Sequence, residues 1–214
     1  MSAGADVQLH CWDHRSWGDG VEDLRRSTEA YRRFLGRAPE GYRAHTYRLT
    51  PELVTALMAN GFRWDSSILP AMAHGGHTGW RGVRADYFVL GERLVEFPLA
   101  VWPTIGIPLT HSYRLLLKPV GEALFRRLVG WPRTVVYDMH MADLVWTKSL
   151  GGSPLPPHVK AMYRYMWGTN RRDSFASLRA FVTDLRRGGY RFTTLGELYR
   201  EVAPVGAIAS ARRT

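Results

Sequence analysis

Signals for strands and helices alternate along the chain, and this alternation limits the fold more than any other feature. Helices are predicted at 19–35, 50–60, 120–129, 174–187 and 196–202. Strand-like runs separate them at 7–9, 62–68, 94–99, 134–140 and 190–195. Such alternation predicts an α/β domain with a mainly parallel sheet, which is either open or closed into a barrel.

Helix starts and stops are well marked in places. Thr50-Pro51-Glu52 combines an N-cap threonine, a proline at the first helical position and an acid in the first turn, and Gly61 marks the end of that helix. The helix at 19–35 is expected to end at a glycine and to bury one apolar face, made of Val21, Leu24, Tyr31, Phe34 and Leu35.

The chain has 214 residues, which predicts one domain over residues 1–203 followed by a flexible tail at 204–214. It carries 29 basic and 19 acidic residues, a net charge of +10. This charge favours anionic partners, including an anionic membrane surface. The basic residues are scattered or paired and form no long run, so a nucleic-acid-binding domain is the least favoured of the functional hypotheses.

The single cysteine excludes an intramolecular disulfide and a zinc cluster built from several cysteines. The first ten residues lack the basic and apolar regions of a signal peptide, and no apolar run is long enough to cross a membrane. A cytoplasmic location is therefore the default expectation.

Two histidines, His10 and His14, follow the first strand-like run. If the segment is helical, residues four apart share one face and can bind one metal ion, with a carboxylate as third ligand and water in the open position. The pair can equally be two unrelated histidines. The segment is not the HExxH motif of zinc proteases, because Cys11 stands where that motif has glutamate.

Polar residues also stand near the ends of later strands. Arg43 lies in "GYRAH", Asp65 in "WDSS", and His140 ends the run "TVVYDMH". Each has an ordinary explanation, namely a surface arginine, a turn-capping carboxylate and a structural histidine. Because sites in α/β folds gather at the carboxyl ends of strands, their convergence with His10 is the main functional clue from the residues alone.

With these residues identified, the chain resembles the polysaccharide deacetylase family, the NodB-homology carbohydrate esterases. "HCWDH" is similar to the metal motif of that family, and "GYRAHTYRLTPELVTALMANGFRWDSSILP" to its arginine segment, helix and Asp-Ser-Ser strand. "VVYDMHMADL" is similar to the strand with the catalytic histidine, and "RRDSFASLRAFVTDLRRGGYRFTTLGEL" to the last helix, strand and helix. The resemblance covers roughly residues 4–202, and "VQLHCWDHRSW" also looks like lipid-linked formamido-arabinose deformylases of the same superfamily.

The resemblance implies a distorted (β/α) barrel and metal-dependent hydrolysis of N-acyl groups on a carbohydrate or lipid-linked saccharide. His10 and His14 would hold a divalent metal, with Zn²⁺ as the expected ion. His140 would be the general acid for the leaving amine, Arg43 would orient an aspartate base, and Asp65 would tune His140. Trp102 and Tyr113 would stack on sugar rings.

The chain departs from the family pattern at three places. His45 stands at the position of a proline, Cys11 replaces a small polar residue, and the Asp-Asp motif expected before the HxxxH motif has no counterpart in the nine residues before His10. We therefore expect a barrel incomplete at its N-terminus and little deacetylase activity. The alternative is a catalytically inactive relative that binds a sugar or lipid-linked sugar.

Overall fold

A computed structural model of the chain describes residues 5–13, 20–70, 86–144 and 174–203, together with positions 157 and 161. The chain divides into two compact units: unit 1 is Met1–Leu99 with Thr193–Thr214, and unit 2 is Ala100–Phe192. Compact units of this kind can belong to one domain or to two, so the single domain over residues 1–203 stays a prediction. The expected tail at 204–214 lies outside the described residues.

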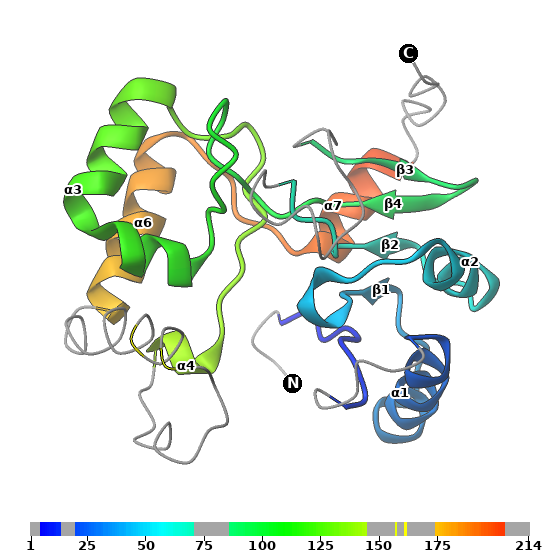
Figure 1. Ribbon diagram of the computed structural model, residues 1–214. Helices are drawn as coiled ribbons and strands as arrows, with labels where there is room; N and C mark the ends of the chain where they lie inside the picture. Colours follow the sequence, from blue (N-terminus) through cyan, green and yellow to red (C-terminus); the bar gives the residue numbers. More distant parts are fainter. Residues whose placement is uncertain are drawn as a thin grey trace. The chain divides into compact units, whose positions relative to one another are not determined.

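Unit 1 is built on a four-stranded sheet with the strand order β1-β2-β4-β3 (Figure 1). The strands are β1 (Gly41–Tyr42), β2 (Trp64–Asp65), β3 (Phe88–Leu90) and β4 (Leu94–Glu96). β1, β2 and β4 run parallel, and β3 pairs antiparallel with β4. The predicted α/β class with a mainly parallel sheet is confirmed. Among the described strands the sheet does not close, so the distorted barrel stays a prediction.

The edge of the sheet at β1 is extended by Leu9, which makes one parallel bridge to Tyr42. The Leu9 N–H donates to the Gly41 carbonyl and the Arg43 N–H donates to the Leu9 carbonyl. Gly41 is required in β1, because a Cβ at that position would lie 2.1 Å from the ring of Trp64.

The helix α1 (Gly20–Leu35) occupies nearly the predicted range, and Gly36 follows it with a positive φ. Leu24 and Tyr31 are buried as predicted, but Val21 and Phe34 are 41% and 78% exposed. Both lie in terminal turns of the helix, beyond the buried stripe of Leu24, Ser27, Thr28 and Tyr31. The predicted apolar face was therefore too long at both ends.

Two further helices of unit 1 begin at the threonine caps that the sequence provides. α2 (Pro51–Ala59) starts after Thr50, whose hydroxyl oxygen accepts a hydrogen bond from the Leu53 N–H. α7 (Leu195–Val202) starts after Thr194, which forms a capping box with Glu197. α2 contacts both α1 and β4, and it places Leu53 and Leu57 in the core of the unit.

Unit 2 contains α3 (His111–Val129), α4 (Met141–Leu144) and α6 (Ser174–Arg187). α6 contacts both α3 and α4. α3 begins nine residues before the predicted start, after an N-cap at Thr110. Pro119 lies within this helix and lacks a backbone N–H. Because an internal proline usually ends or breaks a helix, the sequence does not indicate the turns that precede it.

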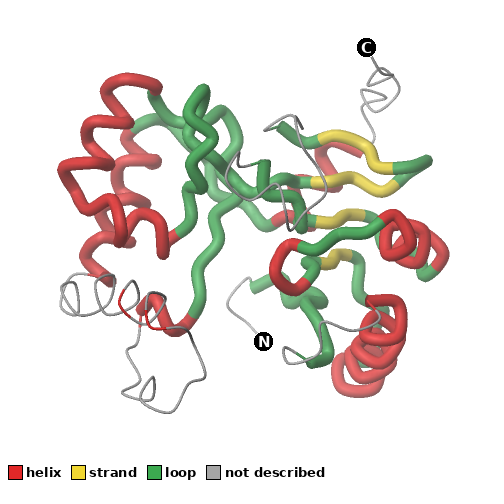
Figure 2. The backbone as a smooth tube through the Cα atoms, in the orientation of Figure 1, coloured by secondary structure: helices red, strands yellow, loops and turns green. Residues whose placement is uncertain are grey.

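The strand predicted at 134–140 is wrong. These residues are a loop (Figure 2), and their backbone pairs with single residues instead of a neighbouring strand. The carbonyl of Val136 accepts from the Ala100 N–H, and that of Asp138 accepts from the His111 N–H. Residues 190–194, also predicted as strand, are irregular. β-branched and aromatic content alone therefore overstated the strand content.

A chain of hydrogen bonds runs through the core of unit 2. The Ser174 hydroxyl donates to the Asp143 carbonyl, so His111 Nε2 donates to the Ser174 oxygen at 2.9 Å. His111 Nδ1 then accepts from the Tyr137 hydroxyl at 2.7 Å, and the Tyr137 oxygen accepts from Arg114 at 3.1 Å. Burial lowers the pKa of His111, which keeps its ring neutral.

The guanidinium of Arg114 anchors one end of this chain. It forms a buried ion pair with Glu122 at 2.8 Å and lies over the face of Phe181, 4.2 Å from the ring centroid. Among the described residues, no helix of either unit has the length and apolar character that a membrane span needs.

Candidate metal centre at the strand ends of unit 1

His10 lies directly after the Leu9 bridge, at the carboxyl end of the first strand-like segment. Its ring atom Nδ1 is 2.7 Å from the carbonyl oxygen of Arg43, which follows the neighbouring strand β1. A carbonyl only accepts hydrogen bonds, so Nδ1 carries the ring proton. The lone pair of the neutral ring is then on Nε2, which is the arrangement of a metal-binding histidine held by an outer hydrogen bond.

Two more potential ligands lie beside this ring. His10, Cys11 and His45 each offer one ligand atom, and the three atoms lie within 4.8 Å of one another. The rings of His10 and His45 meet edge to face, with centroids 6.1 Å apart. All three side chains are half-buried. A possible His/Cys/His metal-binding cluster therefore exists at His10, and the His10–His14 pair stays a prediction.

The loop that carries Cys11 is fixed by the start of α1. The Asp23 carboxylate accepts hydrogen bonds from the backbone N–H of Trp12 at 2.9 Å and of Asp13 at 3.0 Å. An acid in the first turn of a helix is also favoured by the helix dipole. Asp23 therefore serves both the helix and the loop before it.

The thiol of Cys11 is protonated in the absence of a cation. Burial, followed by the negative charges of Asp23 and Asp13, raises its pKa to about 11. A divalent cation at the cluster would act in the opposite direction, because a coordinating thiol loses its proton.

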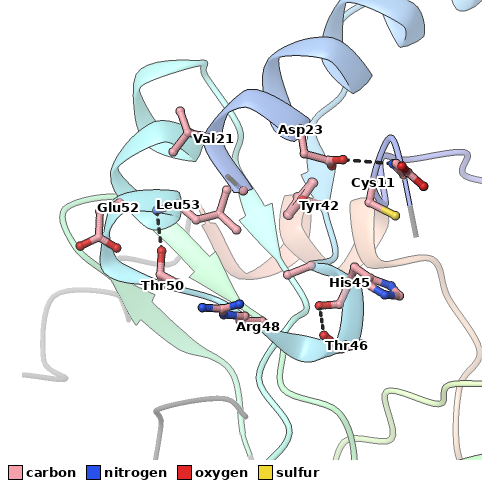
Figure 3. Close-up of a pocket in the computed structure, with 13 residues that line it drawn as sticks. Cys11, Val21, Asp23, Tyr42, His45, Thr46, Arg48, Thr50, Glu52 and Leu53 are labelled. Carbon is pink, nitrogen blue, oxygen red and sulfur yellow. Dashed lines mark hydrogen bonds between the residues drawn. The ribbon is translucent and has the colours of Figure 1, made fainter. Parts of the chain in front are cut away.

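A cavity of about 400 Å³ lies beside the cluster. Figure 3 shows the Cys11 sulfur and the His45 ring on the same side of this cavity, with Asp23, Tyr42 and Arg48 around it. Asp13 also lines the cavity. The volume falls within the range of small-ligand sites, and the lining combines acidic, basic and apolar groups.

The segment 43–45 is held by hydrogen bonds to the "DSS" sequence, which begins with the last residue of β2. Arg43 donates from Nε to the Ser66 carbonyl and from Nη2 to the Ser66 hydroxyl, both at 2.9 Å. The Ala44 N–H donates to the Ser67 hydroxyl, which donates to Asp65. Asp65 is fully buried, so it positions this segment and does not line the cavity.

A second buried carboxyl lies beside Asp65. Glu96 at the end of β4 accepts from the Ile68 N–H at 2.8 Å. Burial raises the pKa of Asp65, and burial together with the Asp65 charge raises that of Glu96 well above its ordinary value. Glu96 therefore keeps its proton more strongly than Asp65 does.

The turn that carries His45 is strained. Thr46 and Tyr47 follow it with φ values of 53° and 60°. For a β-branched residue such as Thr46 the left-handed region is costly, and conformations of this kind are concentrated at functional sites.

The backbone that leads to His10 is fixed by the side chain of Gln8. The Gln8 side-chain oxygen accepts from the N–H groups of Glu40 and Gly41, both at 3.0 Å, and its amide donates to Asp6. Asp6 in turn accepts from the Gly196 N–H at the start of α7.

The predicted general acid, His140, belongs to unit 2. Its side chain is 63% exposed, and Nδ1 lies 3.8 Å from carboxylate oxygens of both Asp138 and Asp143. Burial alone would raise the pKa of Asp143, but hydrogen bonds from His140 and Ser112 outweigh it and the pKa is lowered. Asp143 is thus ionised beside the imidazole.

The remaining predicted site residues belong to unit 2 or lie outside the described residues. His14 is outside the described residues. Trp102 is fully buried with its indole stacked on Trp131, so its place in the structure is that of a core residue of unit 2. Tyr113 is half-buried in α3. Contact of Trp102 or Tyr113 with a sugar stays a prediction.

Cys11 and His45 were not among the predicted ligands. The available signal was the strand-end argument itself: Cys11 follows Leu9, and His45 comes three residues after β1. Both positions depart from the family pattern, and both departures introduce metal-binding atoms.

Comparisons with known proteins give little further guidance. No family model matches the chain, and no curated protein matches it. One solved structure, described as a "putative polysaccharide deacetylase" from Mycobacterium smegmatis, aligns with 22% identity over 60% of this chain and 48% of that chain. The chain therefore spans about half the length of that protein. The TM-score is 0.36, which does not establish a shared fold.

Proposed function

We propose that this chain acts as a metal-dependent hydrolase that removes N-acyl groups from a carbohydrate. The observation that carries the proposal is the cluster of His10, Cys11 and His45 beside a cavity of about 400 Å³. Three protein ligands next to open space are typical of catalytic zinc sites. The sequence resemblance to polysaccharide deacetylases supplies the reaction class.

The residues present fit a divalent ion, because two imidazoles and one thiol each offer a ligand atom and the three atoms lie within 4.8 Å of one another. An ion bound there would polarise an acyl carbonyl and make a water molecule more acidic. Arg43 and Asp65 are positioning residues in this proposal, since they fix the segment that accepts from His10 and carries His45.

Asp13 is the carboxylate that we assign to take the proton of the attacking water. It lines the cavity two residues after Cys11. His140 belongs to unit 2, and its role as the acid for the leaving amine rests on the sequence resemblance alone.

The proposed substrate is a carbohydrate or a lipid-linked saccharide that carries negative charge. Arg48 lines the cavity, and the chain has a net charge of +10. A positive surface raises the encounter rate with anionic molecules and with anionic membrane surfaces.

The test is release of acetate and free amine from N-acetylglucosamine oligomers by the full chain. We expect slow release, because the chain lacks a counterpart of the Asp-Asp motif, and this release should stop after chelation and return with Zn²⁺. Asp13→Asn should lower the rate by about 100-fold or more, as loss of a general base does. Glu92→Gln, a change at an exposed turn, is the matched control and should keep the rate. Sugar binding without zinc-dependent release would contradict the hydrolase proposal and favour the inactive sugar-binding relative.

A further inference from the structure

The ligand set of the cluster differs in kind from two histidines and a carboxylate. It consists of two imidazole nitrogens and one sulfur, from His10, His45 and Cys11. Imidazole binds Zn²⁺, Co²⁺ and similar ions, and thiolate adds preference for softer ions, whereas Mg²⁺, Ca²⁺ and Mn²⁺ prefer oxygen ligands. The composition of the cluster therefore predicts which ions it selects.

The geometry of the cluster suits a tetrahedral ion. With zinc–nitrogen bonds of about 2.0–2.1 Å and zinc–sulfur bonds of about 2.3 Å, ligand atoms in a tetrahedral site lie roughly 3.3–3.7 Å apart. The three atoms here lie within 4.8 Å of one another. Side-chain rotations that close the group by about 1 Å would complete three sides of a tetrahedron.

The backbone that carries the three ligands is held independently of any ion. Leu9 bridges to β1 just before His10, and Asp23 accepts from the N–H groups that follow Cys11. The segment before His45 is fixed through Ala44 to the Ser67 hydroxyl. An ion would thus meet ligands already brought together by the sheet and by the start of α1.

The surroundings of the cluster favour a cation and leave it accessible. The carboxylates of Asp13 and Asp23 line the adjoining cavity and add negative charge near the sulfur. The three ligand side chains are half-buried, so an ion can enter from the cavity.

We propose that His10, Cys11 and His45 bind one Zn²⁺ or Co²⁺ ion per chain as a thiolate-containing site, with the fourth position directed to substrate or solvent. This inference deepens the proposed hydrolase and rests on it only for the role of the ion. It replaces the expected His10–His14 pair with a ligand set taken from two neighbouring strand ends.

The test is titration of the reduced, metal-free full chain with Co²⁺, followed by absorption spectroscopy. Because the chain has one cysteine, a sulfur-to-cobalt charge-transfer band can come only from Cys11. We expect this band to saturate at one ion per chain and to persist in excess Mg²⁺. Cys11→Ser should abolish the band, and His45→Asn should weaken Co²⁺ binding at least as much as loss of an outer partner does, about 10–100-fold.

Two variants separate this site from alternatives. Glu92→Gln changes an exposed turn residue that belongs neither to the cluster nor to the cavity lining, and it should leave the band and the affinity unchanged. His14→Ala should also keep the band. Loss of Co²⁺ binding in His14→Ala, with binding unaffected in Cys11→Ser and His45→Asn, would overturn the proposal.

The result is independent of catalysis. A saturable charge-transfer band without acyl release would support the thiolate site and contradict the hydrolase. Zinc-dependent acyl release that is unchanged in Cys11→Ser, without a band, would support the hydrolase and contradict the thiolate site.

Discussion

His10 in unit 1 and His111 in unit 2 are placed in opposite ways by their surroundings. His10 is half-buried, donates from Nδ1 to a carbonyl, and has the ligand atoms of Cys11 and His45 nearby. His111 is fully buried, and both of its ring nitrogens are engaged by hydroxyl groups of Tyr137 and Ser174. The ring of His111 has no nitrogen left for a ligand.

The comparison shows that the hydrogen-bond partners of a histidine decide its role more than its position in the sequence does. A carbonyl partner fixes one tautomer and directs the other nitrogen outward. Hydroxyl partners at both ring nitrogens use all of the hydrogen-bonding capacity of the ring and hold it in the core. Histidine is thus a candidate ligand in unit 1 and a packed core residue in unit 2.

The largest expected effect is in unit 2. Arg114→Ala should lower the free energy of unfolding by about 3–5 kcal/mol, because it leaves Glu122 partly buried without its partner and removes the contact with Phe181. Urea unfolding measures this. Arg126→Ala, which breaks the partly exposed pair with Asp184, is the control and should cost at most about 1 kcal/mol. Equal losses of unfolding free energy in the two variants would show that the buried Arg114–Glu122 pair stabilises unit 2 no more than an exposed pair does.

Substituting each histidine tests the comparison directly. Without metal, His111→Ala should cost about 2–4 kcal/mol, because it leaves a cavity and unpaired hydroxyl groups. His10→Ala should cost about 1 kcal/mol, the worth of one hydrogen bond.

Zinc should then separate the two variants. At 100 times the dissociation constant a bound ion adds about 2.7 kcal/mol of stability. We expect this gain in the wild type and in His111→Ala, but not in His10→Ala. Thermal unfolding with and without Zn²⁺ measures it, and a full gain in His10→Ala would remove His10 from the ligand set.

The buried acid Glu96 should make the stability of unit 1 depend on pH. Glu96 in unit 1 has a pKa well above its ordinary value because of burial and the Asp65 charge, so the folded state holds a proton that the unfolded state releases. Stability should therefore fall as the pH rises above the unfolded value near 4.5, by up to roughly 1.4 kcal/mol per pH unit. Glu96→Gln should flatten this dependence above pH 4.5. The same slope in the variant would assign the effect to another group.

The smallest effect concerns two strained threonines, one in the described part of each unit. Thr46 in unit 1 and Thr104 in unit 2 have φ values of 53° and 62°. Asparagine tolerates this region better, so Thr46→Asn and Thr104→Asn should each gain up to about 1 kcal/mol in urea unfolding. Only Thr46→Asn should change Co²⁺ affinity, since Thr46 follows His45. A shift of affinity in Thr104→Asn would indicate a general effect of stability.

The sequence predicted the frame of unit 1 well, because its signals are local. The threonine cap of α2 and the glycine after α1 fix helix ends through nearby hydrogen bonds and a positive φ. The strand-end expectation included His10, Arg43 and His140. In the structure the His10 ring contacts the Arg43 carbonyl, whereas the segment that ends at His140 is a loop.

The sequence predicted less where tertiary contacts decide. Residues 134–140 have the composition of a strand, but their backbone forms only isolated hydrogen bonds to other segments and remains irregular. His45 joins His10 across 35 positions of the chain through a strained turn that no local pattern indicates. From the family pattern alone, Cys11 replaces a small polar residue. Whether its sulfur can bind a metal depends on the atoms that the fold places around it.

The side chain of Gln8 has a consequence for the whole site. It binds the N–H groups of Glu40 and Gly41, and so fixes how the first segment is aligned along β1. Neighbouring residues of an extended segment face opposite sides, so a slip of one residue would exchange Leu9 and His10. The imidazole would then occupy the place of the buried leucine and leave the other ligands. One half-buried amide therefore decides whether the three ligands of the proposed metal centre come together.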